Sequence, residues 1–173
     1  MSQFVCNRNS RIVDTTGGKI QGYFYNDVFN FKGVPYRVAE RFHSPKPVPY
    51  TEGIFDATNY GAVCPVLSVP KPTTELKIPH RLWVKNEDCL NLNIWTPALD
   101  DKKRPVLVWL HGGGLRDGSS IEQLAYEGYN AAKKGDIVVV SVNHRLNVLG
   151  YFDLSAFGRE YENSGNNGTA DTL

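Results

Sequence analysis

The stretch "VLVWLHGGGLRDGSS", residues 106–120, joins an apolar run to three consecutive glycines. Residues 106–110 are all Val, Leu or Trp, which is typical of a strand buried on both faces of a sheet. His111 and the glycines at 112–114 follow without a break. Each glycine costs about 0.5–1 kcal/mol of chain entropy relative to alanine. Three of them at the end of a core strand therefore predict that bare backbone is needed there.

The bulk composition is that of an ordinary soluble globular protein and excludes several partner classes. With 173 residues and a formal net charge of +1, the chain gives no reason to expect nucleic acid or an anionic membrane as partner. No apolar run approaches the ~20 residues of a membrane-spanning helix. The start "MSQFVCNRNSR" has no apolar signal core, so we expect a cytoplasmic location. Cys6, Cys64 and Cys89 are too few and too scattered for a disulfide scaffold or a zinc site, and no metal is expected.

The first half of the chain contains turn signals and many prolines. Gly17-Gly18 lies between two short apolar runs and predicts a hairpin, and Asn26-Asp27 predicts a second one. Eight of the ten prolines fall within residues 34–79. Because proline lacks a backbone donor, we expect this stretch to be irregular and to wrap a scaffold or shape a site.

Three strands and one helix are predicted beyond the proline-rich stretch. The strands cover residues 90–95, 105–111 and 136–144, and the last two are continuous apolar runs. Such runs favour interior strands of a largely parallel sheet that helices cover. Between them, residues 119–134 can form a helix. Strand, glycine turn, helix and strand predict a βαβ unit, and hence the α/β class.

The ends of this helix carry recognisable signals. Ser119 with Glu122, or Ser120 with Gln123, has capping-box spacing, and Gly135 suits a C-terminal stop. A glycine in the middle of the helix, at 128, permits two shorter pieces instead.

The glycines have a chemical explanation at this place in an open α/β sheet. Ligands bind at the carboxyl ends of the strands, where residues 111–114 are expected. Backbone without side chains can direct amide N–H groups at an anion there. If the anion is the transient one that forms during acyl transfer, this set of N–H groups is an oxyanion hole. The alternative is a tight turn with no ligand. A phosphate loop is disfavoured, because no Gly-Lys-Ser/Thr and no G-x-G-x-x-G occurs.

Five blocks of the chain resemble the type-B carboxylesterases, the α/β-hydrolase family that includes bacterial para-nitrobenzyl-type esterases and the cholinesterases. One block would be weak evidence, whereas five in the family's order are strong. The second block departs from the family at Asn91, where an aromatic residue or threonine is more usual. The blocks are "FKGVPYRVAERFHSPKPV" (31–48), "EDCLNLNIWTP" (87–97), "PVLVWLHGGG" (105–114), "GDIVVVSVNHRLNVLGYFDLS" (135–155) and "NSGNNGTAD" (163–171). The resemblance implies that residues 1–173 are the N-terminal part of a single α/β-hydrolase domain.

The resemblance also assigns roles around the glycines. It implies that the amides of Gly113 and Gly114 are the oxyanion donors. Gly112 would shape the turn, and His111 would support the loop as a hydrogen-bonded neighbour with no direct catalytic role. His144 would likewise be structural, because the family places its catalytic histidine far downstream.

Two ion pairs and a cysteine pair follow from the same resemblance. Arg145 with Asp171, and Arg41 with Glu87, match structural pairs of the family, so we expect both to be buried; the alternative is solvated surface charge, which contributes little. The cysteines at 64 and 89 fall where secreted members of the family form a disulfide. Such a bridge, over about 25 residues, would stabilise by roughly 3 kcal/mol. Without a signal peptide we expect reduced thiols.

The family's catalytic triad has no counterpart in these 173 residues. A serine esterase needs a G-x-S-x-G nucleophile elbow, followed by an acid and a histidine. No such elbow occurs: "DGSSI" lacks the second glycine and "ENSGN" lacks the first. We therefore expect the chain to end before the elbow and to be inactive alone. We also expect it to be poorly stable, with strand 136–144 exposing an apolar edge.

Three functions compete at this point. The first is the oxyanion part of a serine carboxylesterase that acts on a small-molecule carboxylic ester without a cofactor. The second is a non-catalytic cholinesterase-like binding or adhesion module. The third is a short protein that uses the glycine loop for a small anion or acyl ligand. The oligomeric state is open.

Overall fold

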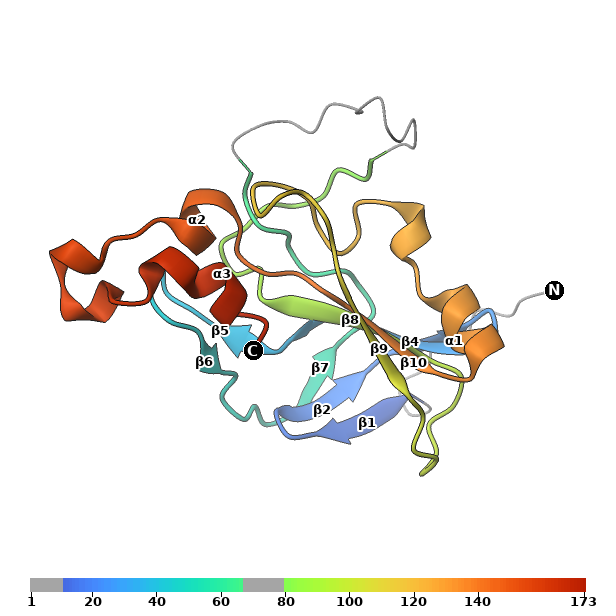
Figure 1. The fold of residues 1–173 in the computed structure, drawn as a ribbon. Helices are drawn as coiled ribbons and strands as arrows, with labels where there is room; N and C mark the ends of the chain where they lie inside the picture. Colours follow the sequence, from blue (N-terminus) through green and yellow to red (C-terminus); the bar gives the residue numbers. More distant parts are fainter. Residues whose placement is uncertain (1–10, 67–79) are drawn as a thin grey trace.

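A five-stranded mixed sheet forms the centre of the protein (Figure 1). The structure is a computed structural model that describes residues 11–66 and 80–173. The strand order is β3-β4-β8-β10-β9; only β10 and β9 are parallel, and the other pairs are antiparallel. The strands are β3 (Tyr23–Tyr25), β4 (Val28–Pro35), β8 (Asn91–Thr96), β9 (Val106–Leu110) and β10 (Val138–Val142).

Smaller elements flank the central sheet. A three-stranded sheet has the order β1-β2-β7, and β5 pairs with β6. In Figure 1, α1 lies at one side of the central sheet, while α2 and α3 lie at the other. The further strands are β1 (Ile12–Thr15), β2 (Gly18–Gln21), β5 (Arg37–Val38), β6 (Lys46–Pro47) and β7 (Ile54–Asp56). The helices are α1 (Tyr129–Gly135), α2 (Asn147–Tyr151) and α3 (Asn167–Ala170), with 3-10 turns η1 (Leu124–Tyr126), η2 (Ser155–Phe157), η3 (Arg159–Tyr161) and η4 (Ser164–Asn166).

Both predicted hairpins are confirmed. In the first, Thr15 lies opposite Gly18, so the turn falls one residue earlier than the Gly17-Gly18 pair predicts. In the second, Asn26 and Asp27 connect β3 to β4 with φ values of +54° and +60°. A two-residue hairpin turn needs left-handed backbone at both positions, and Asn and Asp tolerate it.

The predicted βαβ unit is present, but its helix is shorter than predicted. Residues 119–134 contain the 3-10 turn η1 and then α1, which begins only at Tyr129. Neither of the serine caps forms, since η1 and α1 have no side-chain cap. Gly128 precedes α1 as its N-cap residue and packs closely against Trp95, since a Cβ there would lie 2.7 Å from the Trp95 ring. The C-cap of α1 lies one residue later than predicted, at Asp136, whose backbone is left-handed with φ +50°.

The prediction that strand 136–144 has an open edge is wrong. Within the described residues, β10 is paired on both sides, with β8 and with β9. Among residues 11–66 and 80–173, the edge strands of this sheet are β3 and β9, and β9 is paired on one side only. All five residues of β9 are 42–60% exposed, so the prediction that they are buried on both faces is also wrong. Their composition is nevertheless typical of an interior strand.

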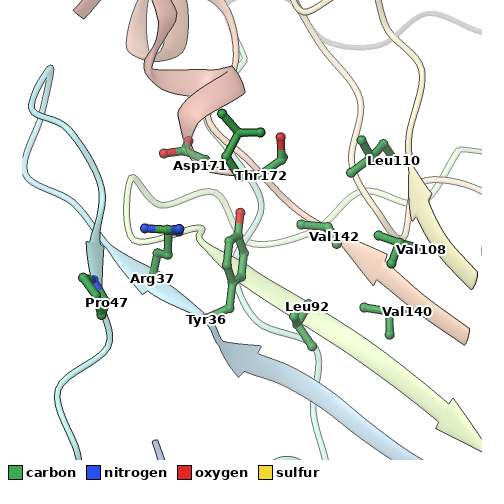
Figure 2. Close-up of a pocket in the computed structure, with 11 residues that line it drawn as sticks. Tyr36, Arg37, Pro47, Leu92, Val108, Leu110, Val140, Val142, Asp171 and Thr172 are labelled. Atoms are coloured by element: carbon green, nitrogen blue, oxygen red, sulfur yellow. The ribbon is translucent and has the colours of Figure 1, made fainter. Parts of the chain in front are cut away.

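The two faces of the sheet are covered differently. Trp95 and Val139 are cross-strand partners on one face, where Ala132 of α1 packs against them. On the opposite face a hollow of about 440 Å³ remains (Figure 2). Its apolar floor and its rim include Leu92, Val108, Leu110, Val140, Val142 and Asp171. One face of β9 and β10 is therefore covered only in part.

A buried lysine links the segment before α1 to the central sheet. Lys32 of β4 is 1% exposed, and its Nζ lies 3.4 Å from the Trp95 ring centroid and 3.7 Å from Oε2 of Glu127. Burial lowers the pKa of Lys32 to about 7. Tyr60 donates its hydroxyl to the same Glu127 carboxylate. These contacts link the segment before α1 to the strands beneath it.

Some expectations fall outside the described residues. Cys6 and three of the clustered prolines, Pro70, Pro72 and Pro79, lie there. Between residues 34 and 66 only short strands form, in agreement with the predicted irregular region. Within the described ranges, no helix has the length and apolar content that crossing a bilayer requires.

The open edge of β9 predicts self-association. Val108→Lys should make the chain less prone to associate, because a charged side chain at a sheet edge opposes pairing with another strand. The free energy of unfolding should change by no more than about 0.5 kcal/mol, since Val108 is mostly exposed. Val139→Lys on the neighbouring strand is the control and should prevent folding, because Val139 is buried. Light scattering and urea unfolding measure both effects, and a Val108→Lys chain that associates as the wild type does contradicts the prediction.

Candidate functional site

The glycine loop leaves the sheet where two parallel strands end together. Leu110, the last residue of β9, is paired with Val142, the last residue of β10. His111 and His144 follow within two residues of these ends, and both are buried. The loop thus begins at the carboxyl edge of the parallel pair, the place where α/β sheets bind ligands.

Two of the three glycines have backbone that other residues avoid. Gly113 has φ +129° and Gly114 has φ +62°. A Cβ on Gly113 would lie 1.8 Å from the carbonyl oxygen of Asp117, so only glycine fits there. Gly112 has no left-handed φ, and a Cβ on it would meet nothing within 4 Å. The backbone therefore requires glycine at positions 113 and 114, whereas the role of Gly112 in shaping the turn stays a prediction.

Hydrogen bonds to two carbonyl groups fix the orientation of these peptides. Nδ1 of His111 lies 2.8 Å from the carbonyl oxygen of Gly112. The carbonyl of Gly113 accepts from the amides of Arg116, at 3.2 Å, and Asp117, at 3.3 Å. In a planar trans peptide, the N–H of the next residue points opposite to the carbonyl. Holding the two carbonyls within the loop therefore turns the N–H groups of Gly113 and Gly114 the other way.

The backbone N–H groups of Gly113 and Gly114 have no hydrogen-bond acceptor among the described residues. Among residues 11–66 and 80–173, neither the N–H of Gly113 nor that of Gly114 donates to a backbone or side-chain group. Both residues are exposed, and Gly114 lines an open surface hollow together with Asn147 and Phe152. Two unpaired donors on adjacent peptides can bind an anion, or an oxygen that gains negative charge during a reaction.

Asn147, a residue that the sequence motifs did not single out, anchors the far side of the loop. Its backbone N–H donates to the carbonyl of Leu115 at 2.8 Å. Its side-chain Nδ2 donates to the carbonyls of Pro65, at 2.8 Å, and Arg116, at 3.4 Å. The φ of Asn147 is +48°, which asparagine tolerates better than most residues. An asparagine shortly after a core strand is the signal that could have found it.

A buried network of amide and hydroxyl groups holds the end of the loop. The amide of Ser120 donates to Oδ1 of Asn143 at 2.8 Å, and Nδ2 of Asn143 donates to Oδ1 of Asn91 at 3.1 Å. Nδ2 of Asn93 lies 3.1 Å from Oγ of Ser120 and 3.2 Å from Oγ of Ser141. Buried polar groups stabilise only when they are paired, as these are. Asn91, the departure from the family pattern, belongs to this network.

The histidines are buried neighbours of the loop. Burial lowers the pKa of His111, and its ring lies parallel to that of His144. Elsewhere, Nδ1 of His80 lies 2.6 Å from Oε1 of Glu122. In the described part of the chain, no group of three or more His, Cys, Asp or Glu side chains could hold a metal ion.

The structure brings together both predicted ion pairs, in different environments. Arg145 is 4% and Asp171 0% exposed, with 2.7 Å between Nη2 and Oδ1. The amide of Arg145 also donates to Oδ2 of Asp171, so the pair joins the end of β10 to α3. Arg41 and Glu87 form a two-pronged pair at the surface, where the arginine side chain is 64% exposed. The expectation that this second pair is buried is wrong, because both residues lie on surface loops.

The two described cysteines are buried side by side as free thiols, in agreement with the expectation of reduced cysteines. Cys64 and Cys89 share a hydrogen bond, and this contact together with burial raises the pKa of Cys89. The amide of Leu146 donates to Sγ of Cys64 at 3.2 Å. The thiols thus pack beneath the segment that carries Asn147.

The glycines provide a matched pair of substitutions. Gly113→Ala should destabilise the chain by at least ~1–3 kcal/mol, because it strains the backbone and places a Cβ against the Asp117 carbonyl. Gly112→Ala should be nearly neutral, since its Cβ would enter open space. Urea unfolding of the two variants tests this difference. Equal stabilities would show that the loop does not have the conformation described.

The ion pairs provide a second matched comparison. Asp171→Ala leaves the Arg145 guanidinium buried and unpaired, and should lower the free energy of unfolding by about 3–5 kcal/mol. Glu87→Ala removes the exposed pair and should change the free energy of unfolding little. Thermal and urea unfolding give both values. An Asp171→Ala chain as stable as the Glu87→Ala chain would contradict the burial of the first pair.

Comparison with known proteins identifies the family. The model of the carboxylesterase family matches residues 9–173. The para-nitrobenzyl esterase of Bacillus subtilis (strain 168) is 37% identical over 158 residues, which cover 89% of this chain and 31% of that protein. The phenmedipham hydrolase of Pseudarthrobacter oxydans is 38% identical over 158 residues, covering 86% and 30%. The chain thus spans about 30% of the length of these curated relatives.

Solved structures agree with this result. An esterase from Clostridium hathewayi that can hydrolyse aliphatic aromatic polyesters superimposes with a TM-score of 0.94 at 49% identity, covering 99% of this chain and 34% of that one. The Geobacillus stearothermophilus carboxylesterase EST55 follows with a TM-score of 0.81 at 39% identity, covering 94% and 32%. The predicted α/β-hydrolase fold is confirmed, as a portion of that fold. The chain belongs to the carboxylesterase family.

Proposed function

We propose that this chain supplies the oxyanion loop of a serine carboxylesterase that hydrolyses small-molecule carboxylic esters. One observation carries the proposal. The carbonyls of Gly112 and Gly113 are held within the loop, and the N–H groups of Gly113 and Gly114, at the end of a parallel strand, have no acceptor among residues 11–66 and 80–173. A donor of this kind stabilises the transition state of acyl transfer by about 3–4 kcal/mol.

In the proposed reaction a serine hydroxyl attacks the ester carbonyl and a histidine takes up its proton. The carbonyl oxygen becomes negatively charged, and the two glycine amides stabilise it without having to reorient. The serine, acid and histidine are not assigned to any of the 173 residues, because no G-x-S-x-G occurs among them. The chain alone is therefore proposed to be inactive. Acyl transfer by this route needs no cofactor.

The names of the relatives support the substrate class. They include a para-nitrobenzyl esterase, a phenmedipham hydrolase and an esterase that hydrolyses polyesters. Two of these three names specify esters, the substrate class that we propose for this chain. We assign residues 1–173 to one α/β-hydrolase domain. We propose a cytoplasmic location, which rests on the sequence analysis.

The alternative of a non-catalytic binding module has no observation in its favour. Gly113 and Gly114 hold left-handed backbone that glycine alone adopts readily, and each glycine costs about 0.5–1 kcal/mol of chain entropy relative to alanine. A module that binds another protein elsewhere on its surface gains nothing from this cost, nor from two amides without an acceptor among the described residues.

A chimera tests the proposal. This chain replaces the matching part of the Clostridium hathewayi esterase, with which it shares 49% identity. We expect hydrolysis of para-nitrophenyl acetate that a serine-directed phosphonate abolishes. Gly113→Ala in the chimera should lower kcat about 10²–10³-fold with a smaller effect on KM, because the loop then no longer presents its donors. Gly112→Ala should retain activity.

The controls separate loss of function from loss of fold. The parent esterase is assayed in parallel, and circular dichroism establishes that each chimera is folded. A folded but inactive chimera, or a Gly113→Ala chimera as fast as its parent, contradicts the proposed function. The 173-residue chain alone should give no turnover above a heat-denatured sample; phosphonate-sensitive turnover would overturn its assignment as inactive.

A further inference from the structure

Two buried histidine rings are stacked at the base of the glycine loop. The ring centroids of His111 and His144 lie 4.9 Å apart, and the ring planes are inclined by only 15°. His111 follows β9 and His144 follows β10, so the stack connects the ends of the two parallel strands. Both residues are no more than 9% exposed. The two rings therefore contact each other in the protein interior.

Hydrogen bonds define the protonation state of each ring. Nδ1 of His111 lies 2.8 Å from the Gly112 carbonyl, and Nδ1 of His144 lies 3.0 Å from the Arg145 carbonyl. A carbonyl can only accept, so Nδ1 carries the proton in both rings. Nε2 of His111 is buried and has no hydrogen-bond partner among the described residues. It is thus the unprotonated nitrogen of a neutral ring.

The His111 ring has little freedom to leave this position. A Cβ on Gly118 would lie 2.8 Å from Nδ1 of His111 and 2.5 Å from the carbonyl oxygen of Gly112. Bare backbone at Gly118, where φ is +104°, thus makes room for the hydrogen bond. The stacked His144 ring lies against the plane of the His111 ring. Two contacts from different parts of the chain therefore confine the imidazole that holds the Gly112 carbonyl.

We propose that His144 is a positioning residue for the oxyanion loop. Its ring holds the plane of the His111 ring, which keeps Nδ1–H directed at the Gly112 carbonyl. That hydrogen bond in turn keeps the N–H of Gly113 pointing away from the loop, since the two groups belong to one trans peptide. The chemical purpose of this amide rests on the proposed function, whereas the positioning itself does not.

Burial and the neighbouring charges act on the protonation of His111. Burial is the main cause that lowers the pKa of His111, and the neighbouring His144 lowers it further. Asp117 and Glu122, on the segment after the glycines, act in the opposite direction, and Glu122 is itself paired with His80. Because the unfolded chain binds this proton more readily, stability from His111 is present near neutral pH and declines as the pH falls below about 6.5.

Nuclear magnetic resonance of the ¹⁵N-labelled, full 173-residue chain tests the proposal without any ester hydrolysis. The imidazole nitrogen shifts report the tautomer of His111, and the amide resonance of Gly113 reports the orientation of its peptide. His144→Phe keeps a flat ring in the stack but removes the hydrogen bond to the Arg145 carbonyl. His144→Ala removes both. His43→Ala is the matched control, because His43 makes the same kind of Nδ1–carbonyl contact, with Arg41 at 2.9 Å, at a site away from the loop.

The expected results separate stacking from general stability. His144→Phe should retain the His111 tautomer and the Gly113 amide resonance, and should raise the pKa of His111, because the neighbouring His144 lowers it. His144→Ala should shift or broaden the Gly113 resonance, and His43→Ala should leave it unchanged. The proposal is overturned if a folded His144→Ala chain keeps the wild-type Gly113 resonance, or if His144→Phe loses it. Should His144→Ala unfold, the His144→Phe result decides alone.

The chimera keeps this result distinct from the proposed function. There, His144→Ala should lower kcat and His144→Phe should restore most of it. An inactive chimera would contradict the esterase assignment and leave the resonance result standing. An active chimera whose kcat is unchanged by His144→Ala would contradict the positioning of the loop by His144.

Discussion

The hydrogen bond from His111 to the Gly112 carbonyl is the constraint on which the site depends. A trans peptide points its carbonyl and its N–H in opposite directions, so the protein can aim a donor only by holding the acceptor beside it. Here the carbonyls of Gly112 and Gly113 are both held, at 2.8–3.3 Å, by donors from the loop itself. Among the described residues the amides of Gly113 and Gly114 then have no acceptor, so a ligand can bind them.

The surrounding structure keeps this turn in place from three directions. Asn147 holds the carbonyls of Leu115 and Arg116 at the outer side of the loop. The asparagine and serine network around Ser120 holds its end against the covered face of the sheet. The buried pair of Arg145 and Asp171 fixes the segment between β10 and α2. Preorganisation of this kind is the main way in which enzymes stabilise charge that develops during a reaction.

Local patterns predicted the two hairpins and the βαβ unit, but not the short strands β5, β6 and β7 or the helices α2 and α3, and they were less informative about which strands are neighbours. Both hairpins, the βαβ unit and the placement of the glycines follow from turn residues and apolar runs within a few positions of each other. The edge position of β9 does not, since its residues suit an interior strand and pairing is decided by distant segments. The close packing of Gly128 on Trp95, more than thirty residues earlier, is likewise not contained in the local pattern.

The site shows the same division between local and distant information. The motif indicated which glycines matter, but only backbone dihedrals showed that Gly113 requires glycine and Gly112 does not. Likewise, the surface position of the Arg41 and Glu87 pair depends on which segments pack around it, and the motif does not contain that information. The contact between His111 and His144 joins residues 33 positions apart and has no sequence pattern of its own.

A crystal structure of the chimera with a phosphonate bound to its catalytic serine tests the central claim most directly. The phosphonate oxygen occupies the position of the oxyanion in acyl transfer. The account predicts that this oxygen lies about 2.7–3.1 Å from the amide nitrogens of both Gly113 and Gly114, with the Gly112 carbonyl still bonded to His111. An oxygen bound by other groups, with these two amides turned away or bonded within their own loop, would contradict it.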